Sequence, residues 1–131
     1  MSDAADDRRW SLLLPKDVPA ARTARSAVDK WLGGTDALTV DAAQSIVTEL
    51  VSNAVQFGRP PIQLTVEHHP AVLRIEVADA GAGMPVHRPP DEHGGWGLEI
   101  VRRLAPRSGT LHGTSGVWCE LLTDPVERSV P

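Results

Sequence analysis

The sequence predicts an α+β fold, a two-layer α/β sandwich with helices on one face of a mainly antiparallel, mixed sheet. Apolar residues at helical spacing and segments of alternating apolar and polar residues give the order strand, two helices, two strands, helix and two strands. Because helices and strands are grouped rather than strictly alternating, this arrangement is the natural one. The 131 residues fit a single domain, expected at 10–123 between flexible ends at 1–9 and 124–131.

The first half of the chain is predicted to hold one strand and two helices. Residues 10–14 form a short apolar run that is typical of an edge or opening strand. Apolar residues at helical spacing then cover 19–32. A second and stronger helical pattern begins near Thr39, with Asp41 as a cap, and ends at Gly58.

The second half is predicted to hold two hairpins, separated by a long loop and a short helix. The loop, residues 79–95, is rich in glycine and proline and has few apolar residues, and a long irregular loop of this kind is typically functional or disordered. Residues 96–105 recover a short helical period. The candidate strands of the two hairpins are 62–67 with 72–77 and 110–112 with 117–122.

Composition excludes several classes of function. The net charge of -4 and the pI near 5.7 argue against direct nucleic-acid binding, because a polyanion binder needs a basic face. Apolar runs are only a few residues long, so neither a membrane span nor a secretory signal is expected, and the predicted location is cytoplasmic. Cys119 is the only cysteine, which excludes an internal disulfide and a multi-cysteine zinc site.

Glu49 and Asn53 are two polar residues within the stronger helical pattern. They are four residues apart, so they project from one face of the helix, at the rim of the apolar stripe. From there they can reach a cleft beside the core, the carboxylate as a base and the amide as a metal ligand. The same pattern fits two solvated side chains at the edge of a helix.

Two glycine-rich segments add further candidates. Asp79 ends an apolar strand and precedes Gly81 and Gly83, which suggests a carboxylate at a sheet end and a backbone that approaches a ligand closely. Ordinary turn chemistry also explains this pattern. Residues 94–98 stand directly before a helix, where backbone N–H groups suit a phosphate, although this is also a normal helix start.

Taken together, the three motifs resemble the GHKL or Bergerat ATP-binding superfamily, which includes DNA gyrase, the heat-shock chaperone ATPases, histidine kinases and anti-sigma factor serine kinases. Residues 49–55 are similar to its N box, 79–85 to its G1 box and 95–98 to its G2 box. The similarity extends from Trp10 to about Leu122, and the small size matches the short anti-sigma kinases. The resemblance implies the Bergerat ATPase fold.

The resemblance also implies a role for each motif residue. Asp79 accepts a hydrogen bond from the adenine amino group, Asn53 completes the coordination of a Mg²⁺ that bridges the phosphates, and Glu49 is the general base that deprotonates an acceptor hydroxyl. Residues 87–94 correspond to a lid over the nucleotide. The residues implied to shape the pocket and contact the triphosphate are Gly81, Gly83, Gly95, Gly97 and Leu98.

The implied function is that of a Mg-ATP-dependent serine/threonine protein kinase, which sequesters a sigma factor or phosphorylates a small antagonist protein. A homodimer is a further expectation from the family. The alternative is an inactive nucleotide-binding or nucleotide-free module that regulates through protein contacts. Gln56 and Phe57 stand where many short anti-sigma kinases have a basic residue and a histidine, and Trp96 stands where they often have an arginine.

Overall fold

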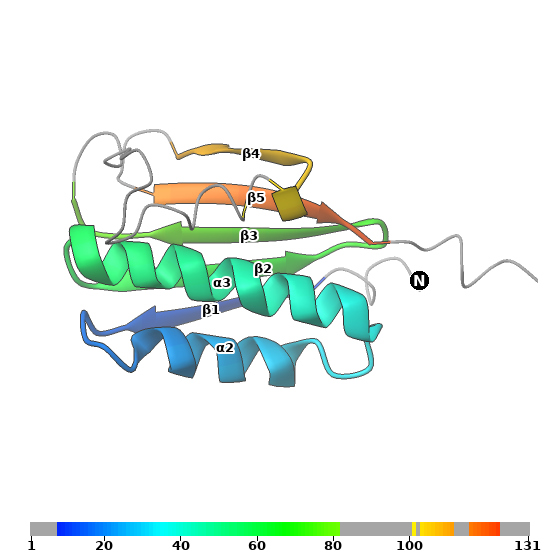
Figure 1. The fold of residues 1–131 in the computed structure, drawn as a ribbon, viewed down its shortest axis with the longest axis horizontal. Coiled ribbons are helices and arrows are strands. Elements are labelled where there is room, and N and C mark those ends of the chain that lie inside the picture. Colours follow the sequence, from blue (N-terminus) through cyan, green and yellow to red (C-terminus); the bar gives the residue numbers. More distant parts are fainter. Residues whose placement is uncertain (1–7, 82–100, 102, 112–115, 124–131) are drawn as a thin grey trace, which may run out of the picture.

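The computed structural model describes residues 8–81, 101, 103–111 and 116–123. These residues form one sheet in the order β1-β2-β3-β5-β4, and each neighbouring pair of strands is antiparallel. Two helices cover one face of the sheet (Figure 1), so the predicted two-layer α+β sandwich is confirmed. The elements are β1 (Arg8–Leu14), α2 (Ala20–Trp31), α3 (Ala37–Phe57), β2 (Ile62–His68), β3 (Val72–Ala78), β4 (Arg107–Thr110) and β5 (Gly116–Leu122).

The hydrophobic core lies between the helices and the sheet. Every second residue of the central strands faces the helices, and Leu64, Ile75 and Cys119 are fully buried there. Burying one large apolar side chain contributes roughly 1.5–3 kcal/mol, so this layer dominates the stability of the fold. The residues that α3 buries against it are Ala43, Ile46, Val47, Leu50 and Val51.

Helix α3 begins earlier than the sequence predicts, and the expectation that Asp41 caps it is wrong. Asp36 is the N-cap: one of its carboxylate oxygens accepts a hydrogen bond from the Thr39 backbone N–H at 3.0 Å, and the other accepts one from the Thr39 hydroxyl at 2.6 Å. This double contact satisfies an N–H of the first turn that has no partner within the helix. Asp41 therefore lies inside the helix, where its side chain is exposed.

The C-terminal hairpin is confirmed, although its first strand lies earlier than the predicted 110–112. Strand β4 begins at Arg107, which pairs with Glu120. Gly109 leaves room for the Trp118 side chain on β5, because a Cβ atom at Gly109 would lie 2.9 Å from the Nε1 atom of Trp118. A glycine inside a strand commonly marks such a close approach, although it weakens the strand signal in the sequence.

The other predicted strands and the predicted helix 19–32 agree with the structure to within a few residues. Strand β1 begins two residues before the predicted 10–14, so it includes Arg8 and Arg9 from the expected flexible N-terminus. In the predicted helix 96–105, the residues that the structure describes as helical are Val101, Arg103 and Leu104. Most of the predicted loop 79–95 lies outside the described residues. In the part of the chain that the structure describes, no helix is long and apolar enough to cross a membrane.

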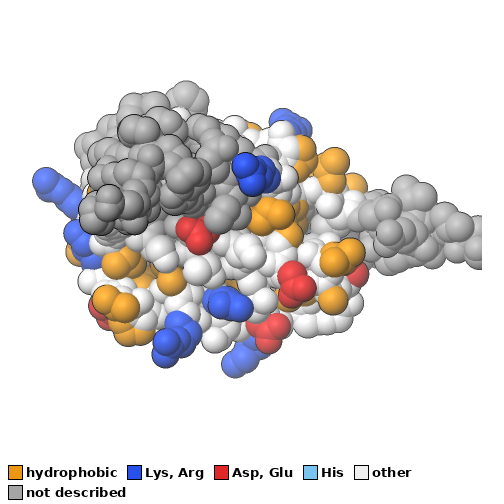
Figure 2. All heavy atoms as spheres, viewed as in Figure 1, with side chains coloured by type: hydrophobic (Ala, Val, Ile, Leu, Met, Phe, Trp, Pro, Cys, Tyr) orange, Lys and Arg blue, Asp and Glu red, His pale blue; other side chains and the backbone are white. Residues whose placement is uncertain are grey.

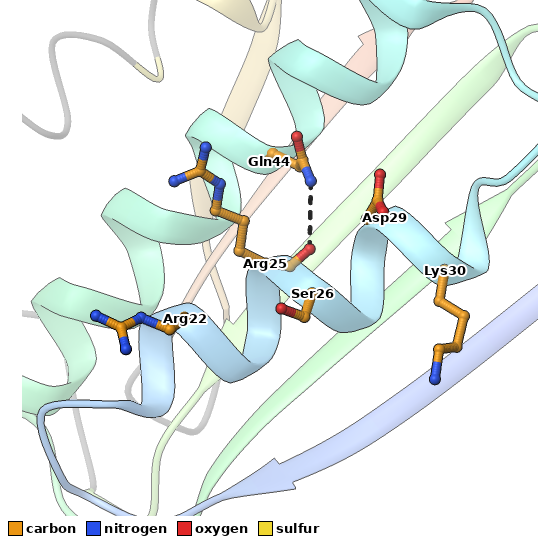
Figure 3. A pocket seen from close by; sticks show the side chains of 6 residues that line it. All are labelled: Arg22, Arg25, Ser26, Asp29, Lys30 and Gln44. Carbon is orange, nitrogen blue, oxygen red and sulfur yellow. Dashed lines mark hydrogen bonds between the residues drawn. The ribbon is translucent and has the colours of Figure 1, made fainter.

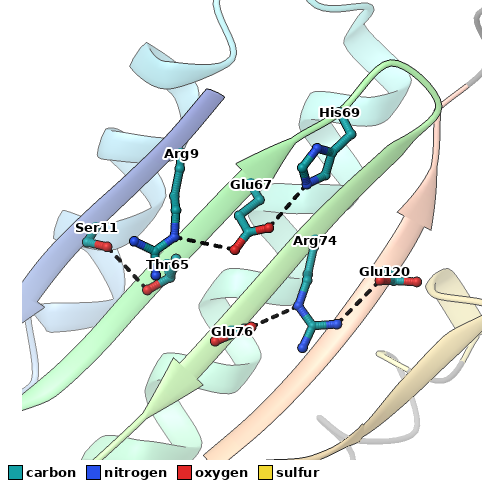
Figure 4. Close-up of polar contacts among 8 residues, drawn as sticks. All are labelled: Arg9, Ser11, Thr65, Glu67, His69, Arg74, Glu76 and Glu120. Atoms are coloured by element: carbon teal, nitrogen blue, oxygen red, sulfur yellow. Dashed lines mark hydrogen bonds and ion pairs between the residues drawn. The ribbon is translucent and has the colours of Figure 1, made fainter. Parts of the chain in front are cut away.

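A ladder of polar side chains lies on the face of the sheet opposite the helices (Figure 4). The Arg74 guanidinium donates to Glu76 at 2.8 Å and to Glu120 at 3.3 Å, and it also lies 4.5 Å from the ring centre of Trp118. Opposite charges on neighbouring strands stabilise a sheet, and the guanidinium gains further from the aromatic face. This face is therefore held together by contacts between β3 and β5.

Glu67 forms a second part of the ladder and makes stability dependent on pH. Its carboxylate pairs with His69 at 3.1 Å and with Arg9 at 3.3 Å. The hydrogen bond from His69 and the contacts with Arg9 lower the pKa of Glu67 below its usual value of 4.5, although partial burial opposes them. Because folding lowers this pKa, the carboxylate stabilises the fold above the unfolded value, and the contribution is lost as the pH falls through the folded value.

We therefore expect Glu67→Gln to lower the free energy of unfolding by up to about 1 kcal/mol at pH 6, the usual range for partly exposed ion pairs. At an acid pH below the lowered folded pKa of Glu67, the difference between wild type and variant should become small, because Glu67 is then protonated in both the folded and the unfolded wild type. Urea denaturation at both pH values measures the difference. An equal loss at both would show that the charge of Glu67 is not responsible.

Candidate functional site

The C-terminal end of α3 and the end of β3 meet, and their contact forms the candidate site. Helix α3 ends at Gly58, whose backbone N–H donates to the Ala54 carbonyl at 2.7 Å. Beyond it, the Arg59 carbonyl accepts a hydrogen bond from the Ala80 N–H at 2.8 Å, and the Arg59 N–H donates to the Asp79 carboxylate. The chain after the helix is thus tied to the chain after the strand.

The Asp79 carboxylate has its orientation set by the backbone. Its Oδ1 atom accepts two hydrogen bonds, from the Gly81 N–H at 2.7 Å and from the Arg59 N–H at 3.2 Å. The bond to Gly81 spans two residues and is the local turn contact that aspartate commonly makes, whereas the bond to Arg59 spans twenty residues. Asp79 is half-buried, and an ionised carboxylate only accepts hydrogen bonds. The backbone of two separate segments therefore sets the orientation of this carboxylate.

Glu49 and Asn53 lie on α3, one helical turn apart, and both are half-buried at the rim of the buried stripe, as the sequence predicts. At about 1.5 Å of rise per residue, Asn53 lies about 7.5 Å along the helix before Gly58, and Glu49 about 6 Å before Asn53. Within the part of the chain that the structure describes, neither side chain forms a hydrogen bond or an ion pair. Their polar groups are thus available to a ligand at the rim.

The remaining predicted site residues divide into two groups. Gly81 is described, and its N–H donates to Asp79, so within the described chain it orients the carboxylate that precedes it. Gln56 and Phe57, which depart from the anti-sigma kinase pattern, are exposed in the last turn of α3. The predicted residues outside the described ranges are Gly83, Gly95, Gly97 and Leu98, together with Trp96 and the lid 87–94.

Sequence reasoning missed two residues of the site, Gly58 and Arg59. Gly58 was interpreted only as the end of a helix, and Arg59 was given no role, yet both lie against Asp79. The role of Gly58 and Arg59 depends on contact with the segment at Asp79, which lies about twenty residues later in the sequence. A glycine after a helix is too common a helix terminator to signal that approach.

Two other kinds of chemistry receive no support from the residues described. Burial raises the pKa of the Cys119 thiol to about 12, so it is not a thiolate nucleophile at neutral pH. No group of three or more His, Cys, Asp or Glu side chains within the described ranges is arranged to hold a metal ion.

A separate groove lies along the exposed side of α2 (Figure 3), and it contains none of the predicted site residues. Gln44 of α3 bridges the two helices at this point, where its amide donates to the Arg25 carbonyl at 3.5 Å. Basic and acidic side chains are interspersed over the helical face of the molecule (Figure 2). The groove is lined by Arg22, Arg25, Ser26, Asp29, Lys30 and Gln44.

Comparison with known proteins agrees with this geometry. The profile of the histidine kinase-like ATPase domain matches residues 14–114, which is most of the chain. The chain belongs to this family. Membership of the histidine kinase-like ATPase family implies that the chain binds ATP.

A solved structure shares the fold of this ATPase-family chain. It contains the RsbU and RsbW domains of Rv1364c from Mycobacterium tuberculosis, and it matches with a TM-score of 0.65 and 24% sequence identity. The match covers 88% of this chain and 31% of the other, so the chain corresponds to under a third of that protein. At this identity the likeness establishes the fold alone. A search of curated proteins gives no match.

Asp79→Asn tests the orientation of the acceptor. Because Oδ1 accepts two backbone N–H groups, the amide oxygen of asparagine should take its place and leave the NH₂ group at the position of Oδ2. If Asp79 recognises adenine, a donor then faces the adenine amino group, and the Kd for ATP should rise about 10- to 100-fold. The Kd for GTP should rise less than the Kd for ATP, or fall, because guanine presents a carbonyl oxygen where adenine has its amino group.

Calorimetric titration of both proteins with ATP and with GTP measures this change in preference. Asp17→Asn, an exposed acid-to-amide change in the turn before α2, is the matched control. Equal weakening of ATP and GTP by Asp79→Asn would contradict the assigned orientation.

Proposed function

We propose that the chain is a Mg-ATP-dependent serine/threonine protein kinase of the anti-sigma factor type, acting in the cytoplasm. It would regulate transcription by sequestering a sigma factor, by phosphorylating a small antagonist protein, or by both. The observation that carries the proposal is the oriented Asp79 carboxylate at the end of the helix that presents Glu49 and Asn53. The family match and the resemblance of the N, G1 and G2 boxes to the anti-sigma kinases support it.

The spacing along α3 fits the order of groups in a nucleotide. With adenine at Asp79, beside Gly58, the phosphates extend along the helix toward Asn53, which lies about 7.5 Å further along the axis. Glu49 lies one turn beyond and would face the group that receives the γ-phosphate. The three side chains thus follow the sequence of base, phosphates and acceptor, from one end of the helix inward.

Asn53 is suited to help hold a magnesium ion. Its amide oxygen is a ligand of the kind that Mg²⁺ accepts, and Mg²⁺ usually takes only one or two protein ligands beside phosphate oxygens and waters. A single half-buried amide without a partner among the described residues fits this requirement. When bound, the ion would offset the negative charge of the phosphates.

Glu49 is suited to act as the general base. The hydroxyl oxygen of a serine or threonine attacks the γ-phosphorus, the bond from that phosphorus to the bridging β–γ oxygen breaks, and ADP leaves. The hydroxyl proton passes to the Glu49 carboxylate. No cation among the described residues pairs with Glu49, so within the described chain no salt bridge has to break before its carboxylate accepts this proton.

The alternative function is that of a regulator that uses the nucleotide site, or only the surface, without phosphoryl transfer. The departures at Gln56 and Phe57 favour it, because both lie in the last turn of α3, close to Asp79, where many short anti-sigma kinases carry a basic residue and a histidine. The two functions differ in whether phosphate reaches a partner protein.

Removal of magnesium tests the first part of the proposal. Titration with ATP should give saturable binding in the presence of Mg²⁺, and EDTA should weaken it. Asn53→Ala should weaken the Mg²⁺-dependent binding about 10-fold or more, since it removes a metal ligand, and it should leave the affinity in EDTA unchanged. The matched control is Ser52→Ala, at the exposed neighbouring position. Full Mg²⁺-dependent affinity in Asn53→Ala would contradict the role of Asn53.

Glu49→Gln tests the kinase. It should reduce phosphate transfer about 10²- to 10⁴-fold, the usual contribution of a general base, and it should leave the Kd for ATP within a factor of two or so. Transfer is measured by mass spectrometry after incubation with ATP and the purified sigma factors and small antagonist proteins of the same cell. If the wild-type protein binds ATP and one of these partners but transfers no phosphate, the regulatory alternative holds.

A further inference from the structure

Gly58 occupies a point where no side chain fits. A Cβ atom built on it would lie 2.6 Å from Oδ2 of Asp79 and 2.7 Å from the carbonyl oxygen of Ala54. Gly58 has φ -92° and ψ -174°, an extended conformation that any residue adopts. The close approach of Asp79 and of the helix end, rather than the backbone conformation, therefore requires glycine here.

The carboxylate is also constrained on its other oxygen. Oδ1 accepts hydrogen bonds from the N–H groups of Arg59 and Gly81, which belong to the segments after α3 and after β3. The two donors thus hold Oδ1, while Oδ2 lies 2.6 Å from the point that a Cβ atom on Gly58 would occupy. Rotation of the carboxylate would break one of the hydrogen bonds or bring an oxygen against the helix end.

We propose that Gly58 is a positioning residue that gives the site its preference for adenine over guanine, an inference that rests on the proposed nucleotide site. Adenine carries an amino group, a donor, where guanine carries a carbonyl oxygen, an acceptor. A carboxylate that cannot rotate meets the guanine oxygen acceptor to acceptor, which is repulsive. A carboxylate that has been displaced loses its contact with adenine and also relieves the conflict with guanine.

Gly58→Ala is the direct test, and Gly33→Ala is its matched control. Both glycines follow the C-terminal end of a helix, but a Cβ atom at Gly33 would make only an ordinary contact, 3.4 Å from the Lys30 carbonyl. In calorimetric titrations Gly58→Ala should lower the ratio of ATP to GTP affinity about tenfold or more, and Gly33→Ala should leave the ratio unchanged. An unchanged ratio in Gly58→Ala, with either nucleotide bound as in wild type, would overturn the proposal.

The contact itself has a readout that needs no nucleotide. In NMR spectra the amide resonance of Gly81, which is far from position 58 in the sequence, should shift in Gly58→Ala because this amide donates to the displaced carboxylate, and it should stay in place in Gly33→Ala. An undisturbed Gly81 resonance in Gly58→Ala would also count against the proposal.

A double-mutant cycle covers the case in which Gly58→Ala is unstable. Asp79→Ala removes both Asp79 atoms that the new Cβ would meet, but it leaves the Ala54 carbonyl in place. Gly58→Ala should therefore lower the melting temperature less in the Asp79→Ala background than in wild type, and it should regain folding there if the single variant does not fold. An equal loss in both backgrounds would overturn the proposed contact.

A wild-type protein that binds neither nucleotide would overturn both the proposed function and the preference for adenine. The NMR and melting data would still show whether Gly58 contacts Asp79.

Discussion

The packing of α3 on the central strands is the constraint on which the site depends. The fully buried side chains of Ile46, Val47 and Val51 fix the rotation of this helix about its axis. A helix is a rigid body, so once the apolar stripe lies on the sheet the positions of Glu49 and Asn53 follow. Glu49 and Asn53 lie at the edge of the helix–sheet interface because the apolar stripe of α3 occupies its centre. Burial of the neighbouring apolar residues therefore determines where these two polar side chains lie.

The same packing brings the end of α3 to the end of β3. The hydrogen bonds of Arg59 with Asp79 and Ala80 then close the junction, so the acceptor and the helix residues are held by one continuous rigid unit. A site built on a helix and a strand end holds its groups more accurately than one carried by a loop. Asp79 belongs to this unit, whereas most of the predicted phosphate loop lies outside the residues that the structure describes.

The two faces of the sheet meet different requirements. One face is apolar and covered by helices, where Trp10 of β1 stacks on Trp31 of α2 with ring centres 5.6 Å apart. On the other face charged side chains pair along and across the strands, as Arg74 does with Glu76 on β3 and with Glu120 on β5. Because these charges satisfy one another, the open face does not need a second layer of helices to be stable. The candidate site lies where the end of α3 meets the end of β3.

The periodicity of the sequence was sufficient to predict the layers, because burial on one face imposes a period of about 3.6 on a helix and 2 on a strand. Two predicted details were wrong. The N-cap of α3 is Asp36, which bonds to Thr39, and not Asp41. Strand β4 begins earlier than predicted, because Gly109 weakens the strand pattern in the sequence. Both depend on single contacts that periodicity does not register.

Asp79 shows the remaining limit of prediction from the sequence. Its bond to Gly81 is ordinary turn chemistry, which was the competing interpretation of this motif, and the structure contains that turn. The turn and the ligand role are compatible, however, because the turn uses Oδ1 and thereby orients the whole carboxylate. What distinguishes this aspartate from any other in a turn is the contact with Arg59 and Gly58, across twenty residues of chain. The sequence shows only that position 58 is a glycine. The structure gives the reason, because a side chain there would collide with Asp79 and with the end of α3.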